Sequence, residues 1–120
     1  MTDTAERIRL EPLNAHVTVA SGDVILADTR HPVLLHETGC PTRYYLPRED
    51  VNLDAMTKTA NRTHCPYKGD ADQYWDCGDL QNVAWSYSAP YAEISDIAGT
   101  VAFYNEIVDI TVDGVLQSRP

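Results

Sequence analysis

The segment THCPYKGDADQYW, residues 63–75, holds the densest set of chemically capable side chains in this chain. The Cys65 thiol becomes a nucleophile when a base, a cation or a helix N-terminus lowers its pKa, and Lys68 lies three residues away. His64 is adjacent, but neighbouring residues of a strand point to opposite faces, so its imidazole is poorly placed to activate the thiol. A small thiol packed before Pro66 is the simpler interpretation, and we expect Cys65 to lie inside the protein.

Lys68 belongs to the tetrapeptide PYKG, in which proline fixes one dihedral and glycine lets the chain reverse. One interpretation is an exposed lysine on an ordinary turn. The other is a positive charge on a rigid base, suited to one anionic group of a small ligand. On the second interpretation, the segment is a strand end, a rigid turn and the start of the next strand. It would present Tyr67 and Lys68 at the mouth of a pocket walled by Trp75 and Trp85.

Aromatic side chains are concentrated between residues 67 and 104. Tyrosine and tryptophan suit the walls of a pocket because one edge of the ring can remain wet, whereas Phe103 is expected in the core. The cluster consists of Tyr67, Tyr74, Trp75, Trp85, Tyr87, Tyr91, Phe103 and Tyr104. It predicts either an ordinary core or an aromatic pocket for a flat or cationic ligand.

The segment RYYLPREDV, residues 43–51, adds two guanidinium groups. Arg43 and Arg48 can hold a phosphate or carboxylate, although a salt-bridged surface corner is the simpler interpretation. Asp50 can cap the turn that follows, or act as an acid–base group. Tyr45 is included among the candidate ligand-binding residues of this region.

Three cysteines are present, Cys40, Cys65 and Cys77, without a CxxC pair. Structural zinc sites are usually announced by paired short spacings, so we expect no zinc and no other metal. An odd count in a chain without an export signal favours free thiols, and we expect no disulfide and no cofactor.

Length and charge limit the classes of protein. The 120 residues are appropriate for a single domain, taken as residues 1–120. Eighteen acidic and nine basic residues give a net charge of −9, which argues against a nucleic-acid partner. No apolar stretch is long enough to cross a membrane, and the start of the chain has no apolar leader, so we expect a cytoplasmic protein.

The charges are also unevenly distributed. Six of the nine basic residues fall between Arg30 and Lys68, and from Asp70 to Ser118 there are nine acids and no Lys, Arg or His. One interpretation is a solvated acidic surface. The other is a local positive site on an acidic body, which would select a small anion over a polyanion.

Short apolar alternations separated by turn residues are typical of antiparallel strands. HVTVASGDVILAD predicts a hairpin with its turn at Ser21-Gly22, in which Val19 faces Val24. HPVLLHE and RYYL predict further short strands. DQYWDC and NVAWSYS predict two strands joined by the Gly-Asp pair at residues 78–79.

The second of these strands would carry Val83, Trp85 and Tyr87 on one face. AEISDIAG predicts a short helix that ends at Gly99. Together the patterns predict an all-β domain of two packed antiparallel sheets with one or two short helices.

The segment GTVAFYNEIVDITVDG, residues 99–114, predicts a hairpin whose turn is the Asn-Glu pair at residues 105–106. Phe103 then faces Val108, and Val101 faces Ile110, so that these four apolar side chains lie on one buried side.

Four segments in this order, YYLPREDV, THCPYKGDADQYW, AWSYSAP and IAGTVAFYNEIVDITVDG, resemble the bacterial domain of unknown function 427 family over residues 16–114. The resemblance implies a β-tent fold, as in methionine sulfoxide reductase B and the thalidomide-binding domain of cereblon. Many β-tent proteins hold zinc with two CxxC pairs, which this chain lacks. The family has also been labelled a nucleotidyltransferase, but the chain has no Gly-Ser helix start followed by a paired-Asp motif for two Mg²⁺ ions.

Two main functions remain open. The first is a binding module for an unknown, anionic small molecule, with an aromatic pocket whose ligand-binding residues are Arg43, Tyr45, Tyr67, Lys68, Trp75, Trp85 and Tyr87. The second is an enzyme acting on a nucleotide or small metabolite, with Lys68 or Cys65 as the reactive group and Asp50 or His64 as its acid–base partner. A protein-interaction domain is a third alternative, and the oligomeric state is open.

Overall fold

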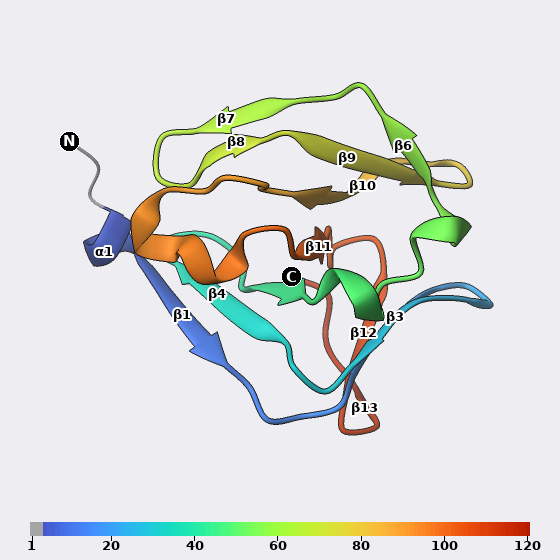
Figure 1. Ribbon diagram of the computed structural model, residues 1–120. Helices are drawn as coiled ribbons and strands as arrows, with labels where there is room; N and C mark the ends of the chain where they lie inside the picture. The colour runs from blue at the N-terminus through green and yellow to red at the C-terminus, as the bar shows by residue number, and fades with distance from the viewer. Residues whose placement is uncertain (1–3) are drawn as a thin grey trace.

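The computed structural model describes residues 4–120 and consists mainly of short antiparallel strands (Figure 1). Seven strands form the largest sheet, which we call the main sheet, in the spatial order β1-β4-β5-β11-β10-β9-β6. Their bounds are β1 (Ile8–Pro12), β4 (Val33–Glu37), β5 (Arg43–Leu46), β6 (Thr57–Thr59), β9 (Gln73–Cys77), β10 (Leu80–Ser86) and β11 (Val101–Phe103).

A four-stranded sheet, which we call the small sheet, has the order β13-β12-β2-β3, and β7 pairs with β8 alone. These strands are β2 (Val17–Ser21), β3 (Val24–Thr29), β7 (Thr63–Cys65), β8 (Gly69–Ala71), β12 (Asp109–Val112) and β13 (Val115–Leu116). The helical elements are α1 (Thr4–Arg7) and three 3₁₀ helices at Arg48–Asp50, Leu53–Ala55 and Ala92–Ile97. The all-β antiparallel architecture predicted from the sequence is therefore confirmed.

A first core fills the space between the two sheets. Trp75 and Phe103 reach it from the main sheet, and Val17 and Val19 reach it from the small sheet. Both valines are fully buried, because alternate residues of each strand point to the same side. This core fixes the orientation of the main sheet and leaves its other face for different residues.

A second core lies on that other face. Ile8 on β1, at one edge of the main sheet, shares it with Tyr74 on β9, near the opposite edge. The sheet must therefore curve around this cluster. Ile94 and Ile97 of the 3₁₀ helix join the same core and are buried, which closes one side of it (Figure 1). Gly99, at φ +74°, follows this helix where the sequence predicted its end.

The predicted hairpin at residues 99–112 is wrong, although its burial pattern is confirmed. Val101, Phe103, Val108 and Ile110 are at most 3% exposed. However, β11 pairs with β5 and β10 of the main sheet, whereas β12 pairs with β2 and β13 of the small sheet. The four side chains meet across the first core rather than along one ladder.

The first hairpin is present with a different register. Ser21 pairs with Val24, so the turn is one residue later than predicted, and a β-bulge then shifts the pairing of Val19 to Ala27. As a result, Val24 is 42% exposed rather than buried. Moving the turn by one residue shifts the pairing by two, so Val24 lies opposite Ser21 at the turn end of the hairpin, beyond the bulge, rather than opposite the buried Val19.

The opening segment behaves as predicted in its backbone: β7, a turn and β8 follow one another, with Gly69 at φ +108°. The predicted common face of β10 is wrong. Val83 belongs to the first core, and Trp85 and Tyr87 belong to the second. The reason is a register shift in β10 next to Asn82, whose φ is +50°.

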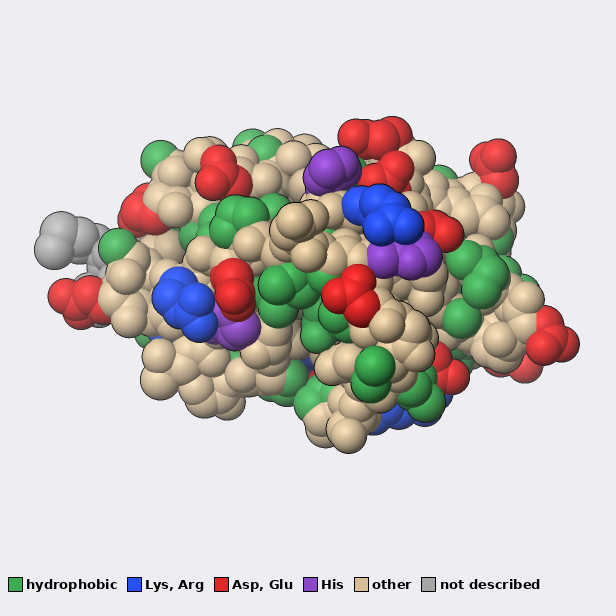
Figure 2. All heavy atoms as spheres, turned by 90° about the horizontal axis from the view of Figure 1, so that it is seen from below, with side chains coloured by type: hydrophobic (Ala, Val, Ile, Leu, Met, Phe, Trp, Pro, Cys, Tyr) green, Lys and Arg blue, Asp and Glu red, His purple; other side chains and the backbone are tan. Residues whose placement is uncertain are grey.

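Among residues 4–120, none of the helices combines the length and the apolar character needed to cross a membrane. Figure 2 shows acidic side chains spread across one face of the molecule, whereas Lys and Arg side chains appear there in small separate groups.

Candidate functional site

An aromatic cavity of about 240 Å³ opens on the side of the main sheet that carries the second core. We call it the aromatic cavity. Five of its eleven lining residues are aromatic, and three more carry a formal charge. The lining residues are Glu37, Cys40, Pro41, Arg43, Tyr45, Thr63, Lys68, Tyr74, Trp85, Tyr87 and Tyr104.

The floor of the cavity is a row of residues across four strands of the main sheet. Tyr45 pairs with Ala102, Ala102 pairs with Trp85, and Trp85 pairs with Tyr74. Directly paired residues share a face, so the three aromatic side chains project together. Ala102 is the one small side chain of the row, which leaves room between its larger neighbours. The Trp85 indole N–H donates to the Tyr45 hydroxyl at 3.1 Å and fixes the two rings edge to face.

Arg43 forms one charged wall of the cavity. Its guanidinium donates to both carboxylate oxygens of Glu106, at 2.5 and 2.9 Å, and to the Asn105 side-chain oxygen at 2.6 Å. It also lies over the rings of Trp85 and Tyr104, at 5.6 and 5.3 Å from their centroids. The hydrogen bond from Arg43 lowers the pKa of Glu106, so this pair is charged and rigidly oriented at neutral pH.

Lys68 forms the second charged wall of the cavity, and an ion pair with Glu37 fixes the position of its ammonium group. The Lys68 ammonium donates to Glu37 Oε1 at 2.5 Å, while Arg7 Nε donates to Glu37 Oε2 at 3.1 Å. The Glu37 side chain is 8% exposed, and that of Lys68 is 14% exposed. Burial alone would raise the pKa of Glu37, but Lys68 and Arg7 outweigh it and leave that pKa below its ordinary value.

Tyrosine hydroxyls supply the neutral polar groups of the cavity. Tyr74 shares a hydrogen bond of 2.7 Å with Thr63. Tyr87 is 6% exposed, and its hydroxyl has no hydrogen-bond partner within residues 4–120. Burial raises the pKa of Tyr87 far above its ordinary value, so the hydroxyl keeps its proton and remains a donor. The hydroxyl oxygen itself is not fully buried, and an unpartnered donor on a residue that lines a cavity is a group that a ligand can satisfy.

Five residues chosen from the sequence line this cavity: Arg43, Tyr45, Lys68, Trp85 and Tyr87. Two others do not. Trp75 lies on the opposite face of the main sheet, in the first core beneath Arg48, so it shares no wall with Trp85. Tyr67 packs against the second core, with its ring 4.5 Å from the Arg7 guanidinium carbon.

Of the four groups proposed for catalysis, Cys65 and Lys68 lie close together, whereas His64 and Asp50 lie elsewhere. Cys65 is half-buried, and the Lys68 ammonium lies 3.8 Å from its sulfur. His64 points away, as expected from strand alternation, and pairs with Asp70 at 2.7 Å on the surface. Asp50 is also elsewhere, because its carboxylate accepts a hydrogen bond from Thr29.

Several residues of the aromatic cavity are not among the ligand-binding residues predicted from the sequence. Glu37 ends an apolar strand and lies 31 residues from Lys68, so no local signal indicates their contact. Tyr74 had a signal, since strand alternation places it on the face opposite Trp75. Tyr104 belonged to the predicted aromatic cluster and Thr63 to the opening segment, but neither was chosen as a ligand-binding residue. Cys40 lies between β4 and β5 and had no signal beyond its residue type.

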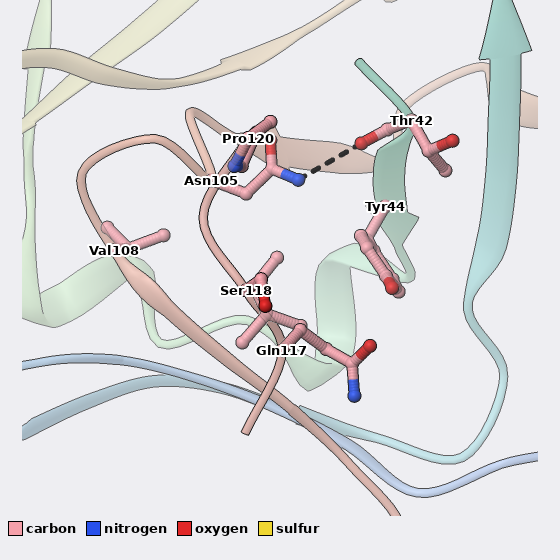
Figure 3. A pocket seen from close by; sticks show the side chains of 8 residues that line it. Thr42, Tyr44, Asn105, Val108, Gln117, Ser118 and Pro120 are labelled. Carbon is pink, nitrogen blue, oxygen red and sulfur yellow. Dashed lines mark hydrogen bonds between the residues drawn. The ribbon is translucent and has the colours of Figure 1, made fainter. Parts of the chain in front are cut away.

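A second hollow, of about 170 Å³, lies beside Tyr44 of β5 and is also lined by Asn105, Gln117, Ser118 and Pro120 (Figure 3). The Asn105 amide N–H₂ donates to the Thr42 carbonyl there at 3.0 Å. Its lining side chains carry no formal charge, and Tyr44 is the only aromatic among them. The aromatic cavity is therefore the better candidate site.

The pKa of Glu37 leads to a prediction about acid stability. Because its folded pKa is lowered, Glu37 stabilises the protein above its ordinary pKa of 4.5, and this contribution is lost as the pH falls through the folded pKa. We expect the free energy of unfolding in urea to fall more steeply below pH 4.5 in the natural protein than in Glu37→Gln. Parallel curves for the two proteins would contradict the proposed charge of Glu37.

These features define the described part of the chain, residues 4–120, as a small antiparallel β domain with an aromatic cavity bordered by charged side chains. The family model described as domain of unknown function (DUF427) matches residues 9–114. The chain therefore belongs to the DUF427 family, as its sequence motifs indicated. No curated protein matches it.

Proposed function

We propose that this protein binds a small anionic molecule with a single planar ring in the aromatic cavity. The observation that carries the proposal is the Tyr87 hydroxyl, a donor without a partner in the described chain, on a residue that lines the cavity among four other aromatic side chains. Aromatic walls favour a flat ring, and a fixed donor favours an acceptor on that ring.

The size of the cavity supports a ligand with one ring. Its volume of about 240 Å³ lies below the range of roughly 300–1,000 Å³ that accommodates drug-sized ligands. A complete nucleotide would extend well outside it, so a free ring acid fits the cavity better than a nucleoside triphosphate.

The charges around the cavity support an anion. Three cations, Arg7, Arg43 and Lys68, are joined to two carboxylates, Glu37 and Glu106. This arrangement has a surplus of one positive charge on a protein of net charge −9. Both oxygens of each carboxylate already accept hydrogen bonds. A ligand that brings one negative charge and an acceptor therefore complements the site.

Titration calorimetry with benzoate, and with benzamide as its neutral analogue, tests the proposal. We expect saturable binding of benzoate and weaker binding of benzamide. Tyr87→Phe should weaken benzoate binding roughly tenfold, because it removes one hydrogen bond to a charged acceptor. Tyr91→Phe is the matched control, since Tyr91 lines a different surface hollow. Absence of benzoate binding, or equal effects of the two substitutions, would overturn the proposal.

An enzyme is the second candidate, and one observation favours it. Lys68 lies within 3.8 Å of the Cys65 sulfur and also contacts Glu37, so three titratable groups converge beside the cavity. The enzyme hypothesis requires that the protein turn over a small metabolite and that Cys65→Ser abolish this turnover. Ligand binding that is unchanged by Cys65→Ser, with no product formed, favours the binding module.

A further inference from the structure

Glu37 occupies the place on Lys68 that a bound anion would take. The carboxylate accepts a hydrogen bond from Lys68 on Oε1, and both residues line the aromatic cavity. An anionic ligand cannot approach the ammonium closely from this direction without meeting the Glu37 charge. This inference rests on the proposed function, since it concerns how the same cavity admits its anion.

The two oxygens of Glu37 serve different cations. Oε1 faces Lys68 in the cavity, and Oε2 faces Arg7 at 3.1 Å. Arg7 does not line the aromatic cavity, and it is held by other contacts. Its guanidinium lies over the Tyr67 ring, and its carbonyl accepts the Thr38 backbone N–H at 3.0 Å. Glu37 therefore has a fixed second partner that remains when Lys68 turns away.

We propose that Glu37 is an internal counter-ion that the ligand displaces from Lys68. Without ligand, Glu37 neutralises Lys68 inside the cavity. When an anion binds, the ammonium turns to the ligand, and Glu37 remains paired with Arg7. The buried carboxylate is never left without a cation, which would be costly in a poorly solvated site.

Glu37 then sets the selectivity of the cavity. A neutral ring offers Lys68 no charge in exchange, so the lysine keeps its partner. A dianion brings a second negative charge close to Glu37 and is repelled. The Glu37 counter-ion therefore favours a monoanionic ligand, and it keeps Lys68 from binding neutral acceptors.

The sign of one substitution separates this role from a structural one. Glu37→Gln keeps the shape of the side chain and removes the competing charge. We expect it to bind benzoate about tenfold more tightly than the natural protein, because a like charge a few ångströms from the ligand is removed. Its affinity for benzamide should change by less than about twofold. Unchanged or weaker benzoate binding by a folded Glu37→Gln would overturn the proposal.

Arg7→Gln provides a second test that does not depend on the folding of Glu37→Gln. Without Arg7, Glu37 has only Lys68 as a partner, so displacement becomes harder and benzoate should bind at least about threefold more weakly. Arg9→Gln is the control, because Arg9 is a neighbouring cation with an exposed side chain and only a 4.0 Å contact to Glu11. Equal losses in both variants, or an equal loss for benzamide, would contradict the exchange of partners. If the natural protein binds neither probe, the proposed function itself fails.

Discussion

Lys68→Met is expected to weaken benzoate binding by at least about tenfold, because it removes the one ammonium group that lines the cavity. The same substitution should lower the free energy of unfolding by about 1–2 kcal/mol. Glu37 would lose one of its two cations while staying buried, which is less severe than complete loss of its partners. One interpretation of the sequence was an exposed lysine on an ordinary turn, for which the effect on stability would be small. The side chain is 14% exposed instead, and the expected effect is larger for that reason.

Calorimetry and urea unfolding measure the two effects separately. Lys58→Met is the matched control, since Lys58 is an exposed lysine on β6, in an edge strand of the main sheet. We expect this control to retain benzoate affinity and to change stability by no more than about 0.5 kcal/mol. Retained benzoate binding in Lys68→Met would remove the lysine from the site.

Phe103→Ala is expected to lower the free energy of unfolding by about 3–5 kcal/mol, a large share of the roughly 5–15 kcal/mol of a typical domain. Phe103 is 1% exposed on β11, and it packs in the first core against residues of the small sheet. Its removal leaves a cavity where the two sheets meet. Urea unfolding checks this value, and much of the variant should be unfolded at moderate urea concentrations.

Ile107→Ala gives the comparison for Phe103→Ala. Ile107 lies in the segment between β11 and β12 and is 39% exposed, so we expect a loss below about 1 kcal/mol. If the two substitutions were equally destabilising, the packing of Phe103 between the main and small sheets would not be a major source of stability.

In the C-terminal strands, the alternation of apolar and polar residues predicts which side chains are buried but not which strands pair. Burial of Phe103 and Val108 followed from the sequence, because each belongs to an apolar alternation. Their pairing did not follow, because the main and small sheets both face the first core. A side chain directed at this core can be in either sheet, so the pattern gives a face but not a neighbouring strand. The residues expected to form the turn serve the site instead: Asn105 and Glu106 both bind Arg43.

The positions of the two tryptophans could have been predicted. Cys77 pairs with Leu80 across the two-residue turn, as the sequence suggested. With that turn, odd-numbered residues of β9 share a face with even-numbered residues of β10, so Trp75 and Trp85 must lie on opposite faces. The aromatic cluster was correctly identified as dense, but its division between two cores requires this register argument.

The charged part of the site could not be predicted in the same way. Arg7, Glu37 and Lys68 come from α1, from the end of β4 and from the turn before β8. Their contacts depend on the curvature of the main sheet, which brings β4 and the β7–β8 pair to one cavity. Local sequence identified the lysine as a candidate, but its partner lies 31 residues away.

A crystal structure of the protein with benzoate is the decisive test of anion binding in the aromatic cavity. We expect the ring in the aromatic cavity beside Trp85 and Tyr87, with the carboxylate within hydrogen-bond distance of the Tyr87 hydroxyl and the Lys68 ammonium. Glu37 should then contact Arg7 and no longer Lys68. Benzoate bound only in the hollow of Figure 3 or on the outer surface, with the aromatic cavity holding solvent alone, would contradict the proposed binding site.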